Sequence, residues 1–230
     1  VTLTWDNGQG QVFEIKLTLD NEYVVTAEQI VRNNGSEPVT VLPWARIRRE
    51  HTPHTAGFYI LHEGFTGVLG GRLHEVTYKD AQTEAARRNG IALEQETTGG
   101  WAGFTDKYWL AAVMPSSPNE TLRAAYRFAN EGGGAAGERW QVDMSAPQPV
   151  TIAPGATSEM GTRVFAGAKE VHLLDSYMER LGITDFDKAI DFGWFYFLVK
   201  PFFLALDWIF RLTGNFGVAI LIFTVLIKAA

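Results

Sequence analysis

The chain has 230 residues, of which 46% are hydrophobic and 20% are charged, a globular composition that excludes disordered and fibrous proteins. Twenty Lys and Arg against 26 Asp and Glu give a formal net charge of −6, which argues against a nucleic-acid-binding protein with a broad cationic face. The absence of cysteine excludes disulfides, cysteine-ligated zinc and cysteine nucleophiles, and it leaves the cellular compartment open.

Charge and hydropathy divide the chain into two parts. Residues 1–193 carry 17 Lys and Arg against 25 Asp and Glu, whereas residues 194–230 carry three and one, and 27 of these last 37 residues are apolar. An acidic body is therefore followed by an apolar tail. Both ends interrupt a regular pattern, so we expect the chain to be a fragment of a longer protein.

The body alternates apolar and polar residues with period two, which predicts long β-strands separated by turns. In the segment 11–20 we expect Phe13, Ile15, Leu17 and Leu19 to be buried. The predicted strands are 1–6, 11–20, 23–33, 39–49, 59–69, 72–79, 91–98, 104–114, 121–128, 140–145 and 159–166. This pattern predicts a mainly β fold, a sandwich of two large antiparallel sheets.

Three segments depart from the strand pattern. Residues 81–89 fit either a helical turn or an exposed loop, and the glycine-rich stretch 130–137 fits a flexible hairpin loop better than a phosphate-binding loop. Residues 169–182 have helical periodicity, with Gly182 as the expected C-cap.

Histidines offer the densest titratable cluster of the body, in Glu50-His51-Thr52-Pro53-His54. A His-x-x-His pair can chelate zinc, but Pro53 breaks the helix on which such a pair usually rests, and a solvated loop is favoured. The remaining histidines, which we interpret as surface or hydrogen-bonded side chains, are His62, His74 and His172. Carboxylates are scattered singly and no Gly-x-Ser-x-Gly elbow is present, so we expect no catalytic, metal or cofactor site.

An aromatic segment spans residues 101–110, from Trp101 to Leu110. We expect Tyr108 or Trp109 to lie in the core with the Asp106-Lys107 pair exposed to water. The alternative is a platform on which a sugar ring stacks.

The tail begins with a predicted amphipathic helix over residues 194–213. On a helical wheel the side chains of Lys200, Asp207 and Arg211 fall on one narrow polar stripe, and aromatic residues cover most of the remaining surface. A buried core helix is the alternative. We favour a helix in the membrane interface with Trp194 and Trp208 at headgroup depth.

Proline and glycine punctuate this part of the chain. Pro201 should kink the helix or start a new turn, and Gly214-Asn215 should end it. The next twelve residues, 216–227, carry no charge and span about 18 Å as a helix, which suits a truncated transmembrane segment. Lys228 then either faces a wet cavity within the span, which we favour, or is the first interfacial residue after it.

The tail resembles the membrane-entry segment of the YidC family of bacterial membrane protein insertases. The residues that carry this resemblance are Asp191-Phe192-Gly193-Trp194-Phe195, Lys200-Pro201, Gly214 to Ile220 and Ile227-Lys228. The body resembles the periplasmic domain of Gram-negative members through Gly103-Phe104-Thr105-Asp106-Lys107-Tyr108-Trp109 and Gly161-Thr162-Arg163-Val164-Phe165-Ala166-Gly167.

The resemblance implies a fold and an order of domains. It implies a β supersandwich like that of galactose mutarotases at 1–168, a helical linker on the sandwich at 169–193, an interfacial helix at 194–213 and the start of a transmembrane helix at 214–230. In the family a basic residue of that helix, usually arginine, attracts client chains from a hydrated groove, and Lys228 is its counterpart here.

The resemblance also implies a function. It implies a noncatalytic insertase and chaperone of the bacterial inner membrane, with its β domain in the periplasm. The implied partners are the lipid bilayer, nascent membrane proteins and components of the Sec translocon, with no nucleic acid and no cofactor. A carbohydrate-binding or mutarotase-like enzyme is the alternative, motivated by the sandwich and by His51, His54 and Trp101.

Overall fold

The structure is a computed structural model that describes residues 1–53, 61–193 and 195–229. The chain separates into two compact units, Val1–Ile190 and Asp191–Ala230, which we call the sandwich unit and the helical unit. The sandwich unit therefore includes residues 169–190, which the sequence analysis separates as a linker.

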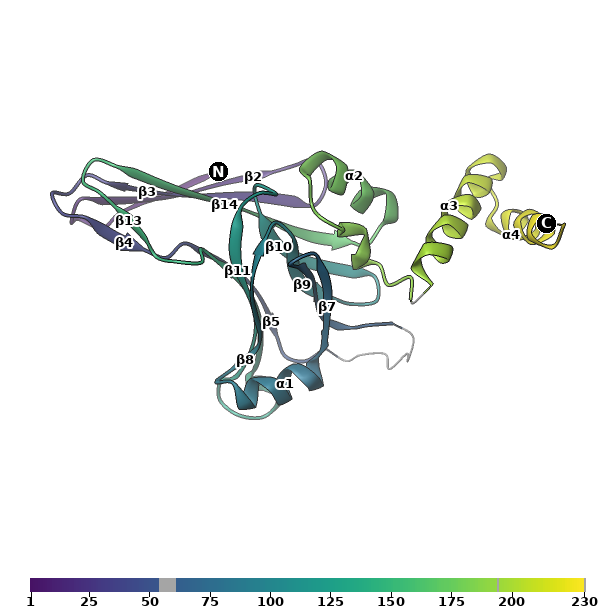
Figure 1. The fold of residues 1–230 in the computed structure, drawn as a ribbon, viewed down its shortest axis with the longest axis horizontal. Helices are drawn as coiled ribbons and strands as arrows, with labels where there is room; N and C mark the ends of the chain where they lie inside the picture. Colours follow the sequence, from purple (N-terminus) through teal and green to yellow (C-terminus); the bar gives the residue numbers. More distant parts are fainter. Residues whose placement is uncertain (54–60, 194, 230) are drawn as a thin grey trace. The chain divides into compact units, whose positions relative to one another are not determined.

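Two antiparallel sheets form the sandwich unit in the described part of the chain (Figure 1). The eight-stranded sheet has the order β1 (Thr2–Asp6), β2 (Gln11–Leu19), β3 (Val24–Asn33), β14 (Thr157–Ala168), β10 (Trp109–Pro115), β9 (Trp101–Thr105), β6 (Gly64–Leu69) and β7 (Arg72–Thr77). The four-stranded sheet has the order β5 (Trp44–Glu50), β12 (Glu138–Ser145), β11 (Thr121–Asn130) and β8 (Ile91–Thr98), and β4 (Val39–Val41) pairs with β13 (Val150–Ile152). The predicted mainly β, antiparallel sandwich is confirmed.

Aromatic residues fill the core between the two sheets. The Phe65 ring stacks on the Tyr126 ring at 4.7 Å between centroids and meets the Trp140 ring edge-on at 5.9 Å. Because Phe65 comes from the eight-stranded sheet and the other two from the four-stranded sheet, these rings join the layers.

Helix α1 (Tyr78–Arg87) covers the residues that the sequence left between a helical turn and an exposed loop. The Thr77 side chain caps it by accepting a hydrogen bond from the backbone N–H of Asp80. Ala81 and Ala85 are buried, so the small residues face the sandwich and the polar ones face water. The glycine-rich stretch contains the short 3-10 helix η1 (Ala135–Gly137) between β11 and β12, in line with a hairpin loop.

A second core lies on the other face of the eight-stranded sheet, under α2 (Val171–Leu181) and the 3-10 helix η2 (Phe186–Ala189). Leu174, Tyr177 and Phe186 are fully buried in it. Gly182 ends α2 with a φ of 67°, so the predicted C-cap is confirmed.

Two predicted strands are each divided in two. The segment 39–49 breaks at Leu42-Pro43, where proline lacks the N–H that a ladder requires. The segment 104–114 breaks at residues 106–108, which form the turn between β9 and β10. In the predicted segment 59–69 the strand is β6, which begins at Gly64 and ends at Leu69. Residues 59 and 60 of this segment lie outside the described residues.

The expected burial of one face of β2 is wrong, because Phe13 and Leu17 are only half-buried and the other two residues are exposed. Ile15 is 41% exposed and Leu19 is 67% exposed. Alternation correctly places these residues on one face of the strand, but no layer among the described residues covers that face at these positions.

Candidate functional site

The helical unit contains two helices, α3 (Tyr196–Thr213) and α4 (Phe216–Ala229), that pack on each other as a hairpin. The rings of Phe202 and Phe223 lie 5.6 Å apart, and those of Phe210 and Phe216 lie 5.5 Å apart. Aromatic contacts therefore join the two helices at the turn and again at the middle of α4.

Gly214 makes the turn between these helices. It adopts a left-handed φ of 66°, and its N–H donates to the Phe210 carbonyl oxygen at 2.8 Å. The Asn215 side chain then accepts from the Val218 N–H at 3.2 Å, which caps α4. The predicted break at Gly214-Asn215 is confirmed.

Pro201 lies inside α3, which begins at Tyr196 and is assigned as one continuous helix through the proline. Of the two alternatives expected for Pro201, a kink or a new turn, the structure contradicts the new turn. Trp194, the first of the two tryptophans expected at headgroup depth, lies outside the described residues, whereas Trp208 is 64% exposed.

Two of the three charged residues expected to form a polar stripe, Asp207 and Arg211, are in contact on α3. Arg211 Nε lies 2.8 Å from Asp207 Oδ2, an (i, i+4) ion pair along the stripe. One turn from the helix start, the Lys200 ammonium lies 5.8 Å from the centre of the Tyr196 ring. Large apolar side chains of α3 are also exposed, and the most exposed of them are Phe197 and Leu212.

Lys228 lies exposed in the last turn of α4, where a cation is favoured by the helix dipole. With 14 residues α4 is about 21 Å long, shorter than the ~30 Å hydrocarbon core of a bilayer. Among the described residues, none of the helices combines the length and apolarity of a membrane span.

The histidines that the structure describes in the sandwich unit do not converge on a metal site. His51 adopts a φ of 63° and donates its N–H to the Glu138 carbonyl oxygen at 3.1 Å, whereas His54 lies outside the described residues. A ring nitrogen of His62 contacts the Phe65 carbonyl oxygen at 2.8 Å. Within residues 1–53, 61–193 and 195–229, no group of three or more His, Asp or Glu side chains could hold a metal ion.

A cleft of about 650 Å³ opens beside these residues, between β12 and α1. Three residues that line this cleft are joined by hydrogen bonds. Trp140 Nε1 donates to Thr52 Oγ1 at 3.2 Å, and the Thr52 hydroxyl donates to a Glu138 carboxylate oxygen. The Trp140 side chain is only 1% exposed, so it presents no ring face to a sugar.

The aromatic segment 101–110 divides between core and surface. Trp101 and Phe104 are buried, which excludes Trp101 as a stacking platform. The expectation that Tyr108 or Trp109 lies in the core is wrong, because their exposures are 64% and 60%. Tyr108 belongs to the β9–β10 turn and Trp109 is the first residue of β10, so both lie at the end of their strands.

Sequence reasoning missed a bidentate ion pair that joins the two sheets. Arg49 on β5 donates to both carboxylate oxygens of Asp106, at 2.7 and 2.5 Å, and also to the Tyr78 hydroxyl at 2.7 Å. The bonds to Asp106 raise the pKa of Arg49 above its ordinary value, and burial raises the pKa of Tyr78 to about 12. Fifty-seven residues separate Arg49 from Asp106, so no local pattern reveals the pair.

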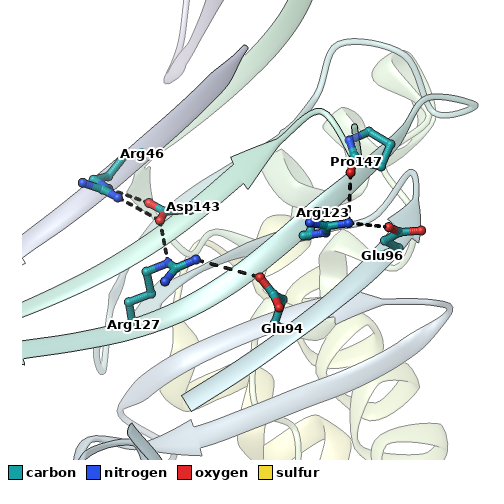
Figure 2. A network of polar contacts seen from close by, with 7 residues as sticks. All are labelled: Arg46, Glu94, Glu96, Arg123, Arg127, Asp143 and Pro147. Atoms are coloured by element: carbon teal, nitrogen blue, oxygen red, sulfur yellow. Dashed lines mark hydrogen bonds and ion pairs between the residues drawn. The ribbon is translucent and has the colours of Figure 1, made fainter. Parts of the chain in front are cut away.

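A second polar network covers the outer face of the four-stranded sheet (Figure 2). Asp143 accepts two hydrogen bonds from Arg46, at 2.5 and 2.9 Å, and pairs with Arg127 at 3.0 Å. Arg123 pairs with Glu96 at 3.0 Å and donates to the Pro147 carbonyl oxygen at 2.9 Å. The arginines shown in Figure 2 are matched by carboxylates on neighbouring strands, so this network stabilises the sheet.

Comparisons with known proteins place this arrangement in a family. The family described as the YidC periplasmic domain matches residues 1–205. The chain belongs to this YidC family. The membrane protein insertase YidC of Granulibacter bethesdensis is 48% identical over 230 residues, covering 100% of this chain and 39% of that protein. The membrane protein insertase YidC of Acidiphilium cryptum is 45% identical over 233 residues, covering 99% of this chain and 39% of that protein.

The chain thus spans about two fifths of the length of these YidC relatives. Among solved structures it is similar to a galactose mutarotase related enzyme from Lactobacillus acidophilus, with a TM-score of 0.47, 7% identity and coverage of 72% of this chain and 66% of that one. A putative aldose 1-epimerase from Escherichia coli K12 matches with a TM-score of 0.44 and 9% identity, covering 73% of this chain and 64% of that one. Neither likeness supports an inference about activity.

Proposed function

We propose that the chain is part of a membrane protein insertase and chaperone that helps inner-membrane proteins to insert and fold. The observation that carries this proposal is the 48% identity, over the full length of the chain, to a protein named membrane protein insertase YidC. The proposed location is the bacterial inner membrane, with the sandwich unit in the periplasm. The proposed partners are lipid, nascent membrane proteins and Sec translocon components.

The helical unit supports contact with lipid. Phe197, Trp208 and Leu212 are more than 60% exposed on α3, although burial of each such side chain is worth about 1.5–3 kcal/mol. The Asp207–Arg211 pair gives the helix one polar stripe. We propose that α3 lies in the periplasmic interface of the membrane with this stripe toward water.

A second part of the proposal concerns Lys228. In the full-length protein we propose that α4 continues as a transmembrane helix and that Lys228 supplies a cation in a hydrated groove. A translocating segment carries acidic and polar groups that hydrocarbon excludes, and a fixed cation lowers the cost of bringing them part-way across. Lysine is a point charge, so general attraction is retained even though the planar fork of arginine is absent.

Complementation of a strain depleted of its own insertase tests this function. We expect full-length protein with Lys228→Arg to support growth, and Lys228→Ala or Lys228→Glu to impair insertion of clients with acidic translocated segments. A matched control is Arg211→Ala, which removes a cation from the proposed interfacial helix, away from the groove. Failure of the unaltered protein to complement would refute the function, whereas equal insertion by all three Lys228 variants would refute only the role of this residue.

Spin labels test the placement of α3 in the full-length protein reconstituted in bilayers. Labels at Asp207 and Arg211 should be accessible to a water-soluble relaxation agent, and a label at Phe203 should be accessible to oxygen in the lipid. Equal depth for all three labels would contradict an interfacial orientation.

We propose no catalytic activity for the chain. Trp101, one of the residues that motivated a sugar-binding or mutarotase-like function, is buried and therefore cannot stack on a sugar ring. Epimerisation of an aldose by the purified protein, abolished by His51→Ala or His54→Ala, would overturn this part of the proposal.

A further inference from the structure

The turn between β9 and β10 exposes two large aromatic side chains. Tyr108 is 64% exposed and Trp109 is 60% exposed, and the Lys107 ammonium lies 5.0 Å from the centre of the Tyr108 ring. Tyrosine and tryptophan have an apolar ring with one polar group, and both are enriched where a protein meets lipid headgroups. We call Lys107, Tyr108 and Trp109 the aromatic tip.

Hydrogen bonds hold the backbone of the aromatic tip in place. The Asp106 N–H donates to the Trp109 carbonyl oxygen at 2.9 Å and closes the turn, and the Lys169 N–H donates to the Tyr108 carbonyl oxygen at 2.9 Å. The Lys169 ammonium also donates to Thr105 Oγ1 at 2.8 Å. Because the backbone is already ordered, the tip can bind a surface with little loss of conformational entropy.

Another exposed aromatic residue lies at the same end of the eight-stranded sheet. In the sheet register Trp109 faces Ala168 at the end of β14, and Phe165 of β14 faces Val24 at the start of β3. Tyr23, which precedes Val24, is 44% exposed. The turns on both sides of β14 therefore carry exposed aromatic rings at this end of the sheet.

The opposite end of β10 has a polar loop. Residues 116–120 read Ser-Ser-Pro-Asn-Glu, and Ser117 and Asn119 are exposed. The exposed aromatic residues of β10 and its two flanking turns are thus confined to the end that carries the aromatic tip.

The short connection to α3 limits how far the sandwich unit can lie from a membrane. The sandwich unit ends at Ile190 and α3 begins at Tyr196, and six fully extended residues span at most about 20 Å. With α3 in the membrane interface, Ile190 lies within this distance of the headgroups. Ile190 packs against the core that also contains Leu110, the residue next to the tip.

The exposed area of the tip suits lipid better than a protein partner. Two aromatic rings of ~150–250 Å² that are about 60% exposed offer roughly 200–300 Å², whereas a stable protein interface needs about 800 Å² on each partner. A small contact is sufficient for a lipid surface here, because the covalent connection to α3 already gives the tip a high effective concentration at the bilayer.

We propose that the aromatic tip is a second membrane contact, at which the sandwich unit inserts Tyr108 and Trp109 into the headgroup region of the bilayer. This inference rests on the proposed function, because it requires α3 at the periplasmic surface of the same membrane. Two points of attachment, the connection at Ile190 and the aromatic tip, then restrict the orientation of the sandwich unit on the bilayer.

Fluorescent labels on single cysteines test the proposal, since residues 1–230 contain no cysteine. Full-length protein lacking any other cysteine is labelled at Tyr108→Cys and reconstituted in liposomes whose lipids carry bromine, which quenches a label in contact with lipid. Asn119→Cys, at the exposed loop beyond the other end of β10, is the matched control. Phe203→Cys reports on α3 in the same liposomes.

We expect brominated lipid to lower the fluorescence of the label at position 108 at least ~2-fold, because this label lies at headgroup depth. The label at position 119 should be unaffected. Trp109→Ser in the protein labelled at position 108 should reduce the quenching, because the second ring that holds the tip in the interface is lost.

The three labels separate the possible failures. An unquenched label at position 108 beside a quenched label at position 203 would refute the lipid contact of the tip and leave the proposed function intact. Unquenched labels at both positions would refute the placement of α3 and this inference together. Equal quenching at positions 108 and 119 would show that the tip has no special contact with lipid. A label at position 108 that is shielded from an aqueous quencher but unaffected by brominated lipid would assign the tip to a protein partner.

Discussion

Replacement of Asp106 by alanine should weaken the connection between the two sheets. Arg49 and Asp106 are 26% and 28% exposed, and the pair has two short hydrogen bonds with favourable bidentate geometry. A hydrogen bond to a charged group contributes about 1.5–3 kcal/mol, and partial exposure reduces the sum for the pair. Asp106→Ala leaves the half-buried Arg49 charge with the Tyr78 hydroxyl and the Phe104 ring but without a carboxylate, so we expect a loss of about 2–3 kcal/mol of unfolding free energy.

Urea denaturation of the 230-residue chain, followed by tryptophan fluorescence, measures this loss. The control is Glu84→Ala, which removes the exposed pair between Glu84 and Arg87 on α1 and should change the unfolding free energy by less than ~0.5 kcal/mol. The double variant Arg49→Leu, Asp106→Leu should recover part of the loss, because it leaves no unpaired charge. If Asp106→Ala costs no more than the control, the pair does not tie the sheets and the reasoning is refuted.

Further predictions concern pH and packing. Because burial raises the pKa of Tyr78 to about 12 from 10, the folded state should lose stability as pH rises from 10 to 12, and Tyr78→Phe should reduce this loss in urea midpoints measured against pH. A Cβ at Gly103 would lie 2.1 Å from the Ala111 carbonyl oxygen, so Gly103→Ala should cost about 1–3 kcal/mol in urea denaturation; an unchanged midpoint would contradict this. Burial opposes ionisation of Asp20, but hydrogen bonds from Tyr177 and backbone N–H groups outweigh it and lower its pKa. Stability from Asp20 is therefore present above its ordinary pKa and lost as pH falls below it, and Tyr177→Phe should flatten this acid-side loss in urea midpoints measured against pH.

Local patterns predicted the elements that depend on neighbouring residues. Period-two alternation predicted the long strands. The helix predicted over 169–182 was also correct, and so was its cap at Gly182, because a helix can end at one residue that adopts a left-handed conformation. The break at Gly214-Asn215 followed from the same chemistry. These features are encoded within a few residues and so can be read from one sequence.

Features that depend on distant residues could not be predicted in this way. Alternation placed Ile15 and Leu19 on one face but carried no information about which layer lies over each position. Trp109 was likewise expected in the core, but it is 60% exposed at the first position of β10. The contact of Arg49 with Asp106 arises only when β5 packs over the β9–β10 turn, so the sequence shows two charged residues and not their pairing.

The two units differ in their aromatic residues, and this difference supports the membrane proposal for the tail. In the sandwich unit Trp101, Trp140 and Phe65 are almost completely buried in its cores, although others such as Tyr108 and Trp109 are exposed. In the helical unit the hairpin buries Ile209 and Ala219, yet Phe197 and Trp208 stay exposed along the helix. A hairpin of two helices has one contact surface and cannot bury side chains on all sides of both helices. The remaining apolar surface requires another apolar environment, and the lipid interface that we propose for α3 provides one along the whole helix.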